Sequence, residues 1–190
     1  ITTASLFNPA NGDQGPGALY NGKAKFFTTY AKPISPFPDV RISHIAIDRT
    51  HTTASDMASY FPLSALFRLY KAQYIGNISP NFYGLPTNRS HRVTIEQDCP
   101  RLVSLCKEDR VDAVVLVPNC PICHQSTALA ASQLEIAGIP SVLMGSALDI
   151  VEHVGVPRLL FNDFPLGNAA GLPQNIVSQD LIAKMAVDLL

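Results

Sequence analysis

The sequence is poor in charge and contains no tryptophan. Charged residues make up 15% of its 190 positions, the formal net charge is −1, and lysine and arginine form no run. Domains that bind nucleic acid carry a clustered basic face, which this composition does not supply. We therefore expect no nucleic-acid partner.

Long hydrophobic runs and a leader-like start are also missing. Apolar segments such as 113–117 are far shorter than the roughly 20 residues of a membrane-spanning helix. The opening ITTASLFNPANG lacks the basic and apolar parts of a signal peptide. These absences predict a cytoplasmic chain without membrane contact. Both ends, ITTA and DLIAKMAVDLL, break off within a structural pattern, so we expect truncated ends.

Cysteine is scarce as well. The four cysteines, Cys99, Cys106, Cys120 and Cys123, are too few and too clustered for the disulfide framework of a secreted scaffold, which favours a reducing compartment. The low charge and the 15 prolines also suggest that another subunit covers part of the surface. We therefore expect an oligomer.

The residues that are present suffice for one hydrophobic core. At 47% hydrophobic content, the chain is long enough for one compact domain over 1–190 and too short for two. Residues 8–39 are rich in glycine and proline, which predicts a long loop or arm. We interpret 39–48 and 74–79 as strands and 81–90 as a turn-rich loop.

The C-terminal half alternates apolar with amphipathic segments. Strand-like runs occur at 111–117, 140–145 and 157–164, and a helical pattern at 124–138 ends on Gly138. This alternation is typical of a parallel sheet covered by helices, so the predicted fold class is α/β, a Rossmann-like three-layer domain with a mostly parallel sheet. Sites form at the carboxyl ends of such strands, which should bring together residues 44–51, 119–124, 145–146 and 163–171.

The strongest chemical signal is the CPIC stretch that joins a predicted strand to a predicted helix. A helix N-terminus favours a thiolate, and the two-residue spacer lets Cys123 reach Cys120. We predict that Cys120 is a nucleophile and Cys123 its resolving thiol. The pair could instead be buried small hydrophobes or zinc ligands, but zinc requires four ligands and no second paired motif occurs, so we expect no metal. Cys99 and Cys106 fall on the core face of a predicted helix.

Two histidines are candidate proton handlers. His124 follows the cysteine pair and could be a general acid or base, a partner of the thiolate, or an exposed helix residue, and its position leaves these readings open. His44 lies near the expected end of a strand, where site residues gather. The LGNAAG stretch at 166–171 lacks the spacing of a dinucleotide fingerprint, so we expect no cofactor bound by this chain.

Longer stretches of the sequence resemble a known protein family. RISHIAID, YFPLSALFRLYKAQYIGNISPNFYG, VDAVVLVPNCPICHQSTALAASQLEIAGIPS and GVPRLLFNDFPLGNAAGLP resemble the selenoprotein B family of glycine, sarcosine, betaine and D-proline reductases, and most closely its D-proline reductase small subunits. By position, the resemblance places Cys120 on the family's selenocysteine, Cys123 on its cysteine and His124 on its histidine. Cysteine at position 120 departs from that pattern, unless it replaces a native selenocysteine.

The resemblance implies a reductase subunit that cleaves the C–N bond of a small amine or amino acid. In the family, the substrate amine is held on a pyruvoyl group of a partner subunit. A thioredoxin-like protein or another dithiol would then return the cysteines to the thiol state. We accordingly expect an oxidoreductase that acts on C–NH donors.

Two other functions fit a cysteine pair of this kind. One is a redox-sensing or assembly subunit in which the pair only forms and opens a disulfide. The other is a cysteine-dependent amino-acid racemase, although that mechanism needs one cysteine on each face of the substrate. Two sulfurs on one turn do not easily supply that arrangement.

Overall fold

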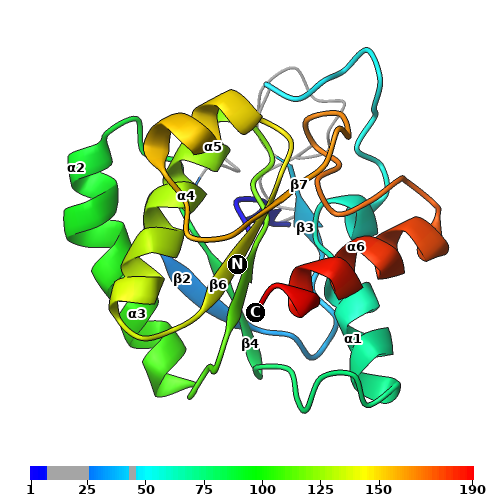
Figure 1. The fold of residues 1–190 in the computed structure, drawn as a ribbon, viewed down its shortest axis with the longest axis horizontal. Helices are drawn as coiled ribbons and strands as arrows, with labels where there is room; N and C mark the ends of the chain where they lie inside the picture. The colour runs from blue at the N-terminus through cyan, green and yellow to red at the C-terminus, as the bar shows by residue number, and fades with distance from the viewer. Residues whose placement is uncertain (8–25, 43–45) are drawn as a thin grey trace.

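The structure, a computed structural model, describes residues 1–7, 26–42 and 46–190 (Figure 1). Its helices and strands, in chain order, are β1 (Ser5–Leu6), β2 (Tyr30–Pro33), β3 (Val40–Arg41), the short helix η2 (Met57–Ser59), α1 (Leu63–Lys71), β4 (Asn81–Gly84), α2 (His91–Val93), the π-helical η3 (Thr94–Asp98), α3 (Cys99–Glu108), β5 (Val114–Leu116), α4 (Pro121–Ile136), β6 (Ser141–Gly145), α5 (Leu148–Val154), β7 (Leu159–Phe161) and α6 (Ile176–Asp188).

A parallel sheet in the order β5-β6-β7 forms the centre of the molecule. Helices α4 and α5 lie on one side of it, and α1 and α6 lie on the other (Figure 1). Because successive side chains of a strand point to opposite faces, Leu143 of β6 packs with α4 and α5 whereas Met144 packs with α6. Strands covered on both faces read as continuous apolar runs, which is how the sequence of β6 was recognised.

The first three residues connect this sheet to the rest of the molecule. The Thr2 N–H donates to the Tyr83 carbonyl at 2.9 Å, and the Leu85 N–H donates to the Thr2 carbonyl at 2.9 Å. On the other side, the Val117 N–H donates to the Ile1 carbonyl at 3.0 Å. Residues 1–3 therefore lie between β4 and the end of β5. Thr2 forms isolated parallel β-bridges with Gly84 on one side and with Val117 on the other.

The α/β class and the parallel arrangement of the C-terminal strands are confirmed. The helix predicted to be closed by Gly138 ends at Ile136, and Gly138, just past the C-cap, has the left-handed φ of 84° that ends many helices. The two remaining sheets, β1-β3 and β2-β4, are antiparallel pairs. The three-layer Rossmann-like arrangement stays a prediction.

The N-terminal half differs from the prediction. Strand β2 lies within 8–39, the stretch that we predicted to be a loop or arm, and it pairs with β4 from Tyr30 opposite Gly84 to Pro33 opposite Asn81. The strand predicted at 74–79 is wrong, because β4 lies instead in the stretch that we predicted to be a turn-rich loop. Short strands leave weak local patterns, so their pairing partner decides where they form. No helix in the described ranges is long and apolar enough to cross a membrane.

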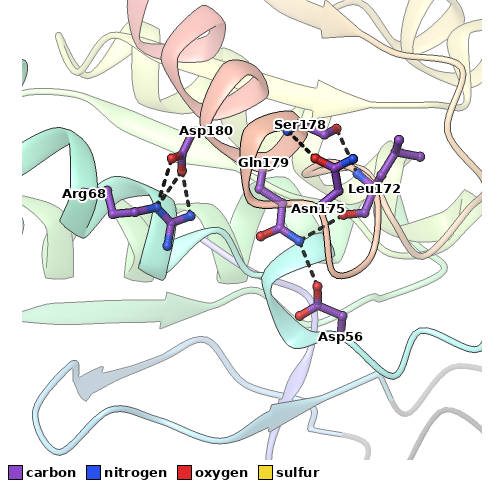
Figure 2. A network of polar contacts seen from close by, with 7 residues as sticks. All are labelled: Asp56, Arg68, Leu172, Asn175, Ser178, Gln179 and Asp180. Atoms are coloured by element: carbon purple, nitrogen blue, oxygen red, sulfur yellow. Dashed lines mark hydrogen bonds and ion pairs between the residues drawn. The ribbon is translucent and has the colours of Figure 1, made fainter.

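A polar network ties α6 to α1 and to the loops beside it (Figure 2). The Gln179 amide donates to the Asp56 carboxylate at 2.8 Å and to the Leu172 carbonyl at 3.0 Å, and Arg68 pairs with Asp180. Next to Leu172, Gly171 has a φ of 122°, and a Cβ atom there would lie 2.9 Å from the Gln179 Cα. Only glycine fits this close approach of the two backbones.

Replacing Gly171 by alanine is therefore expected to lower the free energy of unfolding by about 1–3 kcal/mol, because the new methyl group meets backbone and the φ is strained. Gly76→Ala is the matched control, since a Cβ at Gly76 has no neighbour within 4 Å, and its expected change is within about 0.5 kcal/mol. Urea unfolding of both variants measures the difference. Equal stabilities would contradict the packing described for Gly171.

Candidate active site

The cysteine pair lies where β5 passes into α4. Cys120 is the N-cap residue of α4 and has an extended backbone, with φ −139° and ψ 171°. Its sulfur accepts a hydrogen bond from the Cys123 N–H at 3.3 Å, in the place where helices usually use a serine or aspartate oxygen. Pro121 begins the helix, which suits its fixed φ and its missing N–H. The helix starts three residues earlier than predicted, so Cys123 belongs to its first turn.

The two sulfurs are adjacent, and both cysteines are buried. They are 2.7 Å apart, in hydrogen-bonding contact, and neither forms a disulfide. The exposed fraction is 4% for Cys120 and 0% for Cys123. We call Cys120, the slightly more exposed residue, the outer cysteine of the pair and Cys123 the inner one. This arrangement allows the inner sulfur to attack a bond formed by the outer sulfur without any large movement.

Hydrogen bonds favour the ionised form of the inner sulfur. Burial raises the pKa of Cys123, but hydrogen bonds from the side chains of Cys120 and Thr3 and from the backbone of Asn119 and Cys120 outweigh burial, so the pKa lies below its ordinary value. A low pKa makes a sulfur reactive at neutral pH. The helix N-terminus predicted the lowered pKa for Cys120, whereas the structure shows a lowered pKa for Cys123. The contribution of Thr3 was not predicted.

Thr3 reaches the site from the other end of the chain. Its hydroxyl oxygen accepts hydrogen bonds from the Asn119 backbone N–H at 3.2 Å and from the Asn119 side-chain amide at 3.1 Å. Both residues are fully buried. Asn119 lay within the predicted site range 119–124. Thr3 carried no signal that could have linked it to the cysteines, because the contact depends on where residues 1–3 enter the sheet.

His124 is buried, so its interpretation as an exposed helix residue is wrong. The Ser146 N–H donates to its Nε2 at 3.1 Å, which requires Nδ1 to carry the ring proton and to donate to the Cys120 carbonyl at 2.8 Å. Burial lowers the pKa of His124, although the Cys120 carbonyl and Asp149 oppose this shift. The neutral ring therefore joins the start of α4 to the end of β6. Its use as a proton handler stays a prediction.

The other predicted site segments come together in two groups. Residues 119–124 meet 145–146 through the contact of His124 with Ser146. The stretch 44–51 meets 163–171 where the Asp48 N–H donates to the Leu166 carbonyl at 3.0 Å. The Asn162 N–H links the two groups by donating to the Gly145 carbonyl at 3.0 Å. His44 lies outside the described residues.

Cys99 and Cys106 lie in the core beside α4, as predicted. Burial raises the pKa of Cys99 to about 12 and that of Cys106 to about 11. These two thiols are therefore protonated at neutral pH, unlike the pair at the helix start. Within the described ranges, no three histidine, cysteine, aspartate or glutamate side chains gather into a possible metal site.

Comparison with known proteins finds a curated relative of this chain. The D-proline reductase subunit gamma of Acetoanaerobium sticklandii is 28% identical to this chain over 145 residues, which are 76% of this chain and 60% of that protein. The match thus spans less than two thirds of the relative's length. It supports a D-proline reductase-related family, in agreement with the resemblance seen in the sequence. The correspondence of Cys120 to a selenocysteine stays a prediction.

No family model matches the chain. No solved structure matches it either.

Limited alkylation with iodoacetamide at neutral pH is expected to label Cys120 first. Cys120 is the least buried of the four cysteines, at 4% exposure, and Cys123 at 2.7 Å can take up its proton as it reacts, whereas burial keeps Cys99 and Cys106 protonated at this pH. Mass spectrometry of peptides from the native protein identifies the labelled residue. Earlier labelling of Cys99 or Cys106 would contradict the site assignment.

Acidification tests the neutral state of His124. Its pKa is lowered in the folded protein, so below about pH 6.5 the unfolded chain takes up a proton that the folded chain refuses. Stability is then expected to fall as the pH drops from 7.5 to 5.5, and to fall less in His124→Gln. His153→Gln changes an exposed histidine and should keep the wild-type pH dependence. Urea unfolding at both pH values measures the free energy of unfolding of each protein. Equal pH dependence in all three proteins would refute the neutral state assigned to His124.

Proposed function

We propose that the chain is a thiol-dependent reductase subunit that cleaves the C–N bond of a small amine or amino acid. Cys120 is the nucleophile in this proposal and Cys123 the resolving thiol. The observation that carries it is the sulfur pair itself, 2.7 Å apart and buried at the start of α4, with Cys120 slightly the more exposed residue of the two. The relatedness to a D-proline reductase subunit supports the same class of reaction.

The reaction proceeds in two steps. The Cys120 sulfur forms a bond to the carbon that bears the amine, the C–N bond breaks, and the nitrogen leaves with the electron pair and takes a proton from the dithiol. The Cys123 sulfur then attacks the Cys120 sulfur and forms a disulfide. The carbon leaves with the electrons of the S–C bond and takes a proton. The substrate gains two electrons, and the dithiol loses two.

Further components complete this reaction. We assign amine activation by a pyruvoyl group to a partner subunit, because the resemblance places that group outside this chain. A thioredoxin-like protein or another dithiol returns the disulfide to two thiols. The chain then works in an oligomer of unlike subunits in the cytoplasm. His44 and His124 are proposed to handle protons in the reaction, and a Rossmann-like sheet edge is proposed to hold the site.

The sulfur positions weigh against a racemase. A two-cysteine racemase removes a proton on one face of a carbon and returns it on the other, which requires room for the substrate between the sulfurs. A gap of 2.7 Å leaves no such room. A redox-sensing subunit is compatible with the same geometry, and turnover of a substrate is what separates it from a reductase.

Serine variants separate the two chemical steps. Cys123→Ser is expected to release at most one equivalent of amine per site and then stop, because the adduct on Cys120 is no longer resolved. Cys120→Ser should release none, since a serine hydroxyl without a base is a poor nucleophile. The measurement is amine release from candidate amino acids by the complex purified through the full-length chain, with stoichiometric enzyme and a dithiol reductant.

Cys99→Ala is the matched control, because it removes a buried thiol away from the site and should keep multiple turnover. A full burst from Cys120→Ser would overturn the assignment of the nucleophile. A disulfide that forms and opens in the wild type, with no amine released from any substrate, would favour the redox-sensing function instead.

A further inference from the structure

The Thr3 hydroxyl has a hydrogen-bonding arrangement that fixes the direction of its proton. A hydroxyl oxygen offers two acceptor positions and one donor. The backbone N–H and the side-chain amide of Asn119 occupy the acceptor positions, at 3.2 and 3.1 Å. The one remaining proton is directed at the third partner of this side chain, the Cys123 sulfur.

The orientation of the Asn119 amide supports this assignment. Its Oδ1 is buried and has no hydrogen-bond partner, whereas its nitrogen is bonded to Thr3. Turning the amide over would satisfy the oxygen with the Thr3 proton but would bury two unpaired N–H groups in its place. Because each unpaired buried donor is costly, the orientation that leaves the Thr3 proton to Cys123 is favoured.

The sulfur of Cys123 is thus the end point of several donors. The Thr3 hydroxyl approaches from the N-terminal segment and the Cys120 N–H from the turn before α4, while the Asn119 N–H that donates to Thr3 is shared with the sulfur. The Cys120 sulfur lies 2.7 Å away, and either sulfur could hold the proton between them. The hydroxyl and the N–H groups stabilise negative charge on the inner sulfur, in a place from which water is excluded.

We propose that Thr3 and Asn119 are positioning residues of this site, which hold the negative charge of the reduced pair on Cys123 while Cys120 keeps the shared proton. The inference rests on the proposed function and names the sulfur that is charged before reaction. As Cys120 attacks, its proton passes to the Cys123 sulfur and from there to the departing nitrogen. Cys123 is then again a thiolate and is ready to attack the Cys120 sulfur.

The two threonine variants test the hydroxyl itself. Thr3→Val keeps the shape of the side chain and removes the donor, so the pH midpoint at which the pair ionises should rise by about one unit, a ten-fold loss of thiolate at neutral pH. Thr3→Ser keeps the hydroxyl and should restore the wild-type midpoint. The ultraviolet absorbance of the thiolate, followed from pH 5 to 9, measures the midpoint in the full-length chain. Cys99 and Cys106 ionise above this range.

Two serine variants identify the charged sulfur in the same titration. Cys120→Ser should keep a thiolate that ionises in this range, and Cys123→Ser should lose it. The inference is overturned if Cys123→Ser keeps the thiolate, or if Thr3→Val titrates like the wild type. Where Thr3→Val does not fold, Thr3→Ala removes the same hydroxyl. These readings need no substrate, so absence of amine release with the expected titrations would refute the proposed function alone.

Discussion

The backbone hydrogen bonds of Ile1 and Thr2 are the interaction on which the rest of the structure depends. They insert residues 1–3 between β4 and β5 and so join the antiparallel β2-β4 pair to the parallel sheet. The same insertion brings Thr3 to Asn119, at a separation of 116 residues along the chain. One set of backbone contacts thus completes both the sheet and the surroundings of the inner sulfur.

The surroundings of the cysteines combine burial with dense hydrogen bonding. Burial alone would raise the pKa of Cys123, as it does for Cys99 and Cys106 in the core. What distinguishes Cys123 is its set of donors, since low local dielectric strengthens each hydrogen bond to a charged sulfur. The Asn119 Oδ1 and Ser146 Oγ atoms remain buried without partners nearby, a cost that native structures tend to accept at functional sites.

His124 adds rigidity to this arrangement. The ring connects the Cys120 carbonyl to the Ser146 N–H, so the start of α4 and the end of β6 are held at a constant distance. A Cβ atom at Gly145 would lie 3.2 Å from the His124 ring. The absence of a side chain at Gly145 therefore leaves room for the ring. The sulfur pair is therefore supported from both sides, by Thr3 through Asn119 and by β6 through His124.

The sequence by itself determined the α/β class, the alternation of C-terminal strands and helices, the helix end just before Gly138 and the position of the CPIC stretch at a helix start. Each of these depends on neighbours within a few residues, namely hydrophobic periodicity, the φ of glycine and the N-terminus of a helix. Only the tertiary structure decided the pairing of β2 with β4, the burial of His124 and the contact of Thr3 with the site. These depend on partners distant in the chain, and local patterns in the sequence carry no record of which distant segment a short strand or a single hydroxyl will meet.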